Sequence, residues 1–292
     1  MTEKVSQPDL VDLHVHSNAS DGVYSPREVV ERAAEVGLKA VALTDHDTTA
    51  GLAEALATGE AVGIEVIPGV EISAEFEGGA CHILGYFVEP GAADLARVLE
   101  VAREGRARRN AAILARLSDL GFDLTMDDVT GRQTAGTLTR AHFAAAMIEK
   151  GYVRNWDQAF ETYLGRGKPA YVGRKHVEPA AAIAAIRGAG GLASLAHPRQ
   201  LNRSIAETET WLRRFAEAGI EAVEVSSPDH TANFARHYGE MARRLGLLAT
   251  GGTDWHGRAD SDIRLGVGRG QLAIHYTVVE QMKARLAARR EA

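Results

Sequence analysis

Two histidines two residues apart, His14 and His16, stand at the end of a segment that alternates apolar and polar residues. This segment, 10–15, predicts a β-strand, in which side chains two positions apart project from the same face. A carboxylate follows in the turn Asp21-Gly22. Imidazoles and carboxylates on one face are typical metal ligands. By itself, the pattern equally fits two solvated polar residues at a strand end.

Helical and strand-like patterns alternate in both outer parts of the chain. The first helix is expected to begin at Ser25-Pro26, with Ser25 as N-cap and Glu28 in the first turn. Strands are expected over 10–15, 38–43, 64–71, 72–76, 82–88, 192–196, 220–225 and 247–250. The glycines in 77–79 predict a hairpin between two of them. Short apolar strands that alternate with helices imply a parallel sheet covered on its outside, and barrels of this kind place their active sites at the carboxyl ends of the strands.

Nine residues near these strand ends are candidate metal ligands. They are His14, His16, Asp21, His46, Glu71, His82, His197, Asp254 and His256. His82 differs from the others because it is expected to open its strand. Each residue alone could be structural, but their recurrence at successive strand ends predicts a site for two or three ions. Nitrogen and oxygen donors without sulfur suit Mn, Fe, Zn, Co or Ni.

Phosphate-ester hydrolysis is the chemistry expected of such a site. Ions about 3.5–4 Å apart can activate a hydroxide for attack and stabilise both oxygens of an in-line displacement. The chain has neither a GxxxxGK[ST] nor a GxSxG motif, so NTPase and serine-hydrolase functions lack support.

The bulk composition is that of an ordinary globular protein. The chain has 292 residues, of which 45% are hydrophobic and 25% charged, and it has no apolar run long enough to span a membrane. Its single cysteine, Cys81, cannot form an internal disulfide. The net charge of −6 argues against a general nucleic-acid-binding surface. We therefore expect a cytoplasmic protein that does not bind a membrane and has no obligate protein partner.

The middle of the chain differs in both pattern and charge. One or two long helices are expected over 93–120, and shorter helices near 126–130, 139–150 and 155–164. Residues 101–175 carry 13 basic and 8 acidic residues, net +5, against −11 for the remainder. We predict a helical, basic insertion over 101–174 that acts as a substrate lid, between two barrel segments, 9–100 and 175–292. A solvated, arginine-rich helix face would explain the charge equally well.

Six motifs resemble those of the PHP (polymerase and histidinol phosphatase) family. In chain order they are DLHVHSNASDG, LTDHDT, PGVEIS, CHILGY, LAHP and GGTDWHG. The resemblance covers roughly 9–100 and 175–270, and all nine family ligand positions are filled. It implies an α/β fold, a distorted (β/α)7 barrel with a trinuclear site that usually holds Mn²⁺ and sometimes Fe or Zn. His14, His16, Glu71 and Asp254 would form its centre, with Glu71 as a bridge.

The stretches 139–142 (TRAH) and 167–172 (GKPAYV) resemble the inserted region of stand-alone PHP phosphoesterases, although Ala141 replaces the family's usual proline. Those proteins remove the 3′-phosphate from nucleoside 3′,5′-bisphosphates, and some shorten 5′-phosphorylated RNA. A basic lid could grip a second phosphate. The residues nominated for substrate contact are Arg140, His142, Lys168, Tyr171 and Arg199. Each could instead form a surface or interdomain salt bridge.

Two further residues are nominated for catalysis. His230 is expected to donate a proton to the leaving oxygen or to bind substrate. Asp47 is expected to orient His46 or the substrate.

The leading expectation is a phosphatase that releases the 3′-phosphate of a small nucleotide with two phosphates and leaves the nucleoside 5′-monophosphate. A 5′→3′ exoribonuclease acting on short RNA would use the same site, with the insertion as a 5′-phosphate clamp. Histidinol-phosphate phosphatase is a third reading. A non-catalytic PHP binding module is a fourth, and it predicts missing ligands.

Overall fold

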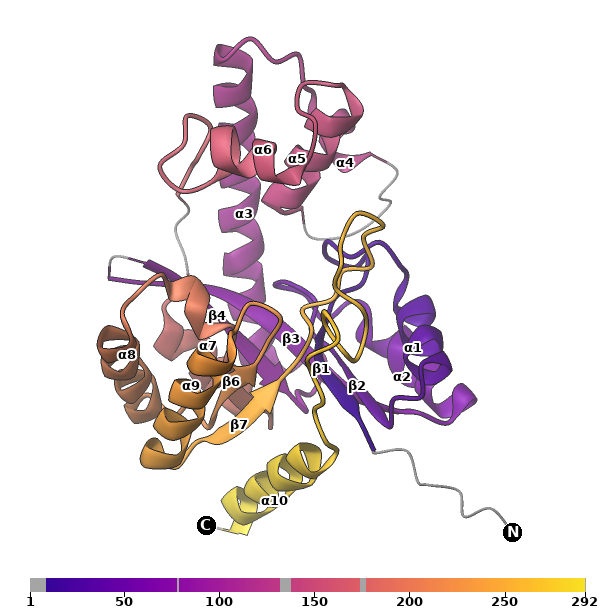
Figure 1. Cartoon of the computed structure of the whole chain (residues 1–292), viewed down its shortest axis with the longest axis vertical. Coiled ribbons are helices and arrows are strands. Elements are labelled where there is room, and N and C mark those ends of the chain that lie inside the picture. Colours follow the sequence, from indigo (N-terminus) through magenta and orange to yellow (C-terminus); the bar gives the residue numbers. More distant parts are fainter. Residues whose placement is uncertain (1–8, 78, 132–137, 174–176, 292) are drawn as a thin grey trace.

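A computed structural model describes residues 9–77, 79–131, 138–173 and 177–291 (Figure 1). Seven strands pair in chain order: β1 (Val11–Val15), β2 (Ala40–Leu43), β3 (Glu65–Phe76), β4 (Gly79–Tyr86), β5 (Leu192–Leu195), β6 (Ala222–Ser226) and β7 (Leu248–Gly251). The chain beyond β7 returns to β1, where the backbone N–H of His16 donates to the carbonyl oxygen of Trp255 at 2.9 Å. The result is a nearly closed seven-stranded α/β barrel.

The predicted parallel sheet is interrupted at β4, the second strand of the predicted hairpin. This strand runs antiparallel to both β3 and β5, and the other neighbouring pairs are parallel. A parallel connection needs a crossover of a dozen or more residues, and the chain between Phe76 and Gly79 is far too short for one. The predicted hairpin is confirmed, with Gly78 outside the described residues. His82 lies within β4, opposite Ser73, and does not open the strand.

The segments 64–71 and 72–76, predicted as separate strands, form the single strand β3. It pairs with β2 up to Pro68 and with β4 from Gly69 onward. Proline cannot donate to a ladder, so it fits the point where the strand changes partners. A side chain at Gly69 would lie 2.8 Å from the carbonyl oxygen of Leu43, so this close approach requires glycine.

An irregularity in β1 decides which side chains face the barrel interior. Val11 and Leu13 pack in a core cluster with residues of the neighbouring strands and of the C-terminal helix. The register of β1 against β2 shifts between Asp12 and Val15, and Val15 packs in the cluster under the outer helices. A bulge of this kind re-aims side chains, and here it places His14 and His16 on the interior side.

Helices cover the outside of the barrel, and a further helix lies below its lower end (Figure 1). The outer helices are α1 (Pro26–Glu35), α2 (Leu52–Val62), α7 (Pro179–Gly188), α8 (Ile205–Glu217) and α9 (Ala232–Leu245), and the lower helix is α10 (Thr277–Glu291). A short 3₁₀ turn, η2 (Pro198–Leu201), follows β5. The predicted start of α1 is confirmed: Ser25 is the N-cap, Pro26 is the first helical residue, and Ser25 and Glu28 form a capping box. No helix in the described ranges is long and apolar enough to cross a bilayer.

The middle of the chain rises from the barrel along one 27-residue helix, α3 (Ala93–Asp119) (Figure 1). Around its upper half lie α4 (Met126–Thr130), α5 (Arg140–Glu149), α6 (Trp156–Ala159) and a π-helical turn, η1 (Phe160–Leu164). These elements share a separate apolar cluster that includes Ile113, Phe143 and Leu164. The boundaries 101 and 174 remain a prediction, and residues 174–176 lie outside the described residues.

Candidate metal centre and active site

The structure gathers all nine predicted ligands at one end of the barrel. β1 and the loop after it supply His14, His16 and Asp21, and β3 and β4 supply Glu71 and His82. The loops that follow β2, β5 and β7 supply the remaining four, which are His46, His197, Asp254 and His256. Every one of the nine belongs to a group of three or four residues whose ligand atoms lie within 4.8 Å of one another.

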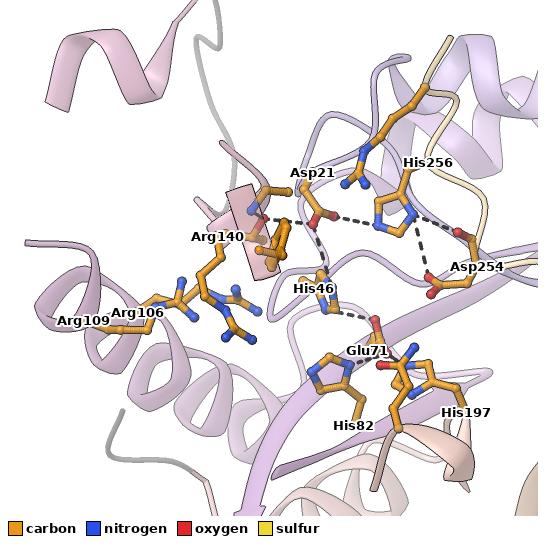
Figure 2. Close-up of a pocket in the computed structure, with 15 residues that line it drawn as sticks. Asp21, His46, Glu71, His82, Arg106, Arg109, Arg140, His197, Asp254 and His256 are labelled. Carbon is orange, nitrogen blue, oxygen red and sulfur yellow. Dashed lines mark hydrogen bonds and ion pairs between the residues drawn. The ribbon is translucent and has the colours of Figure 1, made fainter. Parts of the chain in front are cut away.

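Glu71 lies at the centre of this cluster, and its two oxygens face different histidines (Figure 2). Oε1 lies 2.8 Å from Nδ1 of His82 and 3.0 Å from Nε2 of His197. Oε2 lies 2.9 Å from Nδ1 of His46 and 3.4 Å from Nε2 of both His14 and His16. A carboxylate in this position could bridge ions, as expected for Glu71.

The two aspartates complete the cluster on the opposite side from His82. Oδ1 of Asp254 lies 3.1 Å from Nε2 of His16 and 3.4 Å from Nε2 of His14. Oδ1 of Asp21 lies 3.2 Å from Nε2 of His256. Four overlapping sets of nitrogen and oxygen donors therefore meet in one space.

The residues present fit a site for several divalent ions. Nε2 of His14, both ring nitrogens of His16, Nδ1 of His46 and Oε2 of Glu71 are buried and make no hydrogen bond within the described part of the chain. Leaving such atoms unsatisfied is costly, and metal ions would satisfy them. Burial lowers the pKa of His16 to about 3 and that of His82 to about 4, which favours the neutral rings that bind metal. Nearby carboxylates outweigh burial at His14, His197 and His256 and raise the pKa of these rings.

A second set of buried groups supports the ligands from behind. Glu224 on β6 accepts from the backbone N–H of His197 at 2.7 Å, and its other oxygen lies 3.1 Å from Nδ1 of His14. Asp12 accepts from the backbone N–H and the hydroxyl of Thr253, next to Asp254. Neither carboxylate was predicted from the sequence, because no local motif distinguishes a supporting carboxylate from any other buried one.

A cavity of about 340 Å³ separates this cluster from a wall of arginines (Figure 2). Arg106 and Arg109 reach it from α3, Arg140 from the start of α5, and Arg258 from the loop after β7. A second cavity of about 350 Å³ shares His82, Arg140 and His197 with the first and is also lined by Tyr171. The site thus combines clustered acids and imidazoles on one wall with cations on the other.

Of the five predicted substrate contacts, the structure brings Arg140 and Tyr171 to these cavities. His142 instead accepts from the backbone N–H of Thr139 at 3.0 Å. Lys168 is exposed and is absent from the lining of both cavities. Arg199 is exposed, with its guanidinium over the ring of Phe234 at 4.5 Å. Arg106, Arg109 and Arg258 were not nominated, although the run of arginines in α3 was the available signal.

Asp47 forms an ion pair with Arg106, one of the arginines that line the cavity. Oδ2 accepts from Nε of Arg106 at 2.7 Å, and Oδ1 accepts from the backbone N–H of Ser73 at 2.7 Å. The Arg106 guanidinium also donates to the hydroxyl of Ser73 at 2.9 Å. Asp47 therefore orients Arg106, and its predicted action on His46 or on the substrate remains a prediction.

His230 is buried beside the site. Its Nδ1 lies 2.8 Å from the carbonyl oxygen of Val225, which assigns the proton to Nδ1 and a lone pair to Nε2. Nε2 is buried and makes no hydrogen bond to any described residue, and burial lowers the pKa of the ring. His230 is absent from the lining of both cavities, so its expected roles in proton donation or substrate binding remain predictions.

Barrel, ligand cluster and cavity together define a metal-dependent hydrolase. A family model described as PHP domain matches residues 12–167. The chain belongs to the PHP family, and it is a metal-dependent phosphoesterase.

Three relatives illustrate the similarity. The chain is 36% identical over 247 residues to the 3′,5′-nucleoside bisphosphate phosphatase of Chromobacterium violaceum, covering 84% of this chain and 87% of that protein. It is also 36% identical over 249 residues to a 5′-3′ exoribonuclease of Haemophilus influenzae, covering 84% and 89%. The structure of an amidohydrolase from Chromobacterium violaceum with bound sulfate and no metal matches with a TM-score of 0.86 at 33% identity, covering 94% and 96%.

Proposed function

We propose that the protein hydrolyses the 3′-phosphate of nucleoside 3′,5′-bisphosphates, with Mn²⁺ as its metal. The observation that carries the proposal is the pairing of two walls in one cavity. The ligand cluster forms one wall, and Arg106, Arg109, Arg140 and Arg258 line the same space. A substrate with two phosphates matches this pairing, because one phosphate can meet the metal centre while the arginines bind the other. The similarity to a protein named as such a phosphatase supports the assignment.

The nine ligands would hold two or three ions, with Glu71 and the histidines around it at the centre. Such ions supply Lewis-acid polarisation of a phosphate and activation of water at neutral pH. Arg140 is placed to bind the second phosphate through charge-assisted hydrogen bonds, which fix the substrate's orientation. Asp47 and Ser73 hold the guanidinium of Arg106 in place.

The test compares substrates with one and with two phosphates. Phosphate release from adenosine 3′,5′-bisphosphate should require Mn²⁺ and stop on addition of a chelator. Arg140→Ala should lower kcat/KM for the bisphosphate by about 10–100-fold, corresponding to the loss of a charge-assisted hydrogen bond of about 1.5–3 kcal/mol. The same variant should act on adenosine 3′-monophosphate nearly as well as the wild type. No release from the bisphosphate by protein with bound metal would refute the proposal.

A 5′→3′ exoribonuclease is the second candidate, because the chain is equally identical to a relative of that name. The same cluster would cleave a phosphodiester, and the second cavity would receive an adjoining nucleotide. A 5′-phosphorylated RNA oligomer tested beside the bisphosphate separates the two. Efficient shortening of the oligomer, with slow phosphate release from the bisphosphate, would place RNA processing first.

A further inference from the structure

One hydrogen bond joins the insertion to the predicted ligand Asp21. The hydroxyl of Thr139 donates to Oδ2 of Asp21 at 3.0 Å, across 118 residues of sequence. Thr139 is buried, with 6% of its surface exposed. The same hydroxyl accepts from the backbone N–H of Ala141 at 3.1 Å. Nδ1 of His142 also lies 3.3 Å from this hydroxyl, but it already accepts from the backbone N–H of Thr139. A hydroxyl has one proton to donate, and here the carboxylate is the nearer acceptor.

Asp21 belongs to one of the ligand groups of the metal centre. Its group also contains His16, His46 and His256. The oxygen that faces His256, Oδ1, is not the one that Thr139 contacts. Thr139 can therefore fix the rotation of the carboxylate while Oδ1 stays directed toward the ligand cluster.

Thr139 also begins the helix that carries Arg140. It is the N-cap of α5, and its backbone N–H donates to Nδ1 of His142, which completes a capping box. Arg140 follows as the first residue of the helix and lines the cavity. The residue that contacts the predicted ligand is thus adjacent in the chain to the arginine that faces the metal centre.

We propose that Thr139 is a positioning residue that couples the metal centre to the insertion. Its hydroxyl orients Asp21 and, through the first turn of α5, sets the distance between Arg140 and the bound ions. The part that concerns the substrate's second phosphate rests on the proposed function. Coupling of this kind is reciprocal. Ions that fix the position of Asp21 also order the first turn of α5, and an ordered first turn favours metal binding.

Other contacts hold the same two parts together. Arg106 on α3 binds Asp47, and the guanidinium of Arg258 lies 4.3 Å from the ring centre of Trp156 on α6. Losing the Thr139 hydroxyl should therefore loosen the start of α5 without releasing the insertion. The effect is expected on metal affinity and substrate preference, with the fold retained.

The test uses three variants and a matched control. Thr139→Val removes the hydroxyl at nearly constant shape, Thr139→Ser keeps it, and Thr139→Gly removes it while glycine still serves as an N-cap residue. Thr125→Val is the control. Thr125 caps α4 with the same type of capping box, but its hydroxyl bonds to the half-buried Asp128 and not to a predicted ligand.

The first two measurements do not depend on activity. Mn²⁺ titrated into metal-free protein should bind at least one site about tenfold more weakly in the valine and glycine variants, as expected for loss of a supporting hydrogen bond. Thr139→Ser and Thr125→Val should stay within about twofold of the wild type. Amide hydrogen exchange in 140–149 should slow on Mn²⁺ addition in the wild type and Thr139→Ser, but not in the valine and glycine variants. The coupling would be overturned by two results together: Mn²⁺ affinity unchanged in the valine and glycine variants, and amide exchange in the wild type that does not respond to Mn²⁺.

The third measurement separates positioning from a general loss of structure. In Thr139→Val, the ratio of kcat/KM for adenosine 3′,5′-bisphosphate to that for adenosine 3′-monophosphate should fall, because Arg140 is displaced. Equal losses on both substrates would contradict the positioning role. If the wild type releases phosphate from neither, the proposed function fails, while the metal titration and hydrogen exchange still decide whether Thr139 couples the two parts.

Discussion

Oε1 of Glu224 lies 3.1 Å from Nδ1 of His14, and both side chains are fully buried. In this contact the Nδ1–H of His14 donates to the carboxylate, which leaves Nε2 directed toward Glu71. Oε2 of Glu224 accepts from the backbone N–H of His197, whose φ of 24° is unusual for a residue with a side chain. One carboxylate therefore orients two predicted ligands, one on β1 and one in the loop after β5.

Glu224→Gln should weaken Mn²⁺ binding about 10–100-fold. Both partners of Glu224 are N–H donors. The oxygen of a glutamine amide could accept from one of them, but its NH₂ group would face the other donor and make no hydrogen bond. Titration of metal-free protein with Mn²⁺ measures the loss. Glu209→Gln on α8, where the carboxylate pairs with Arg244 of α9, is the control and should bind Mn²⁺ like the wild type. Unaltered affinity in Glu224→Gln would show that His14 and His197 are oriented without it.

Chelation should lower both activity and the free energy of unfolding. An ion that binds only the folded state contributes about 2.7 kcal/mol when its concentration is 100 times its Kd. The thermal midpoint should therefore fall after treatment with a chelator and recover with Mn²⁺. Mg²⁺ should restore much less, because a set of six imidazoles and three carboxylates is poorer in oxygen than Mg²⁺ prefers. Full recovery with Mg²⁺ would contradict this description of the site.

Arg106→Met should destabilise the protein by about 3–5 kcal/mol, because it leaves the buried carboxylate of Asp47 without its cation. Arg106→Met combined with Asp47→Asn removes both charges and should be less destabilised than the single variant. Chemical denaturation of the three proteins measures the difference. A double variant less stable than Arg106→Met would show that the charge pair is not the source of the loss.

His142 should make stability depend on pH. Burial lowers the pKa of its ring, so the folded chain keeps it neutral, while the unfolded chain takes up a proton near pH 6.5. Because the unfolded state then binds the additional proton, this contribution is present above about pH 6.5 and is lost as the pH falls below it. His142→Gln keeps a capping-box acceptor for the N–H of Thr139 and removes the titration.

The thermal midpoint should therefore fall less between pH 7 and pH 5 in His142→Gln than in the wild type. Comparing the two proteins isolates this ring from the other histidines, which titrate in both. Identical pH profiles would show that His142 is not held neutral by the fold.

Much of the fold could be predicted because the signals are local. Ser25, Pro26 and Glu28 marked the start of α1, and the period of apolar residues marked most strands. The hairpin that reverses the direction of β4 was predicted from the glycines in 77–79, but the antiparallel pairing of β4 with β5 was missed, because no local signal tells which strand lies on its other side. The switch of partners at Pro68 and Gly69 was also missed, because it depends on which strand lies beside each half of β3.

The sequence by itself determined which groups could bind metal. Imidazoles and carboxylates after successive strands are sufficient to predict the cluster, because parallel strands bring their carboxyl ends to one edge. Only the tertiary structure decided what surrounds it. The bulge in β1 that turns His14 and His16 inward, Glu224 behind His14, Arg106 on Asp47 and Thr139 on Asp21 all depend on contacts between distant segments. Such contacts are set by packing and leave no periodic or compositional trace in the chain.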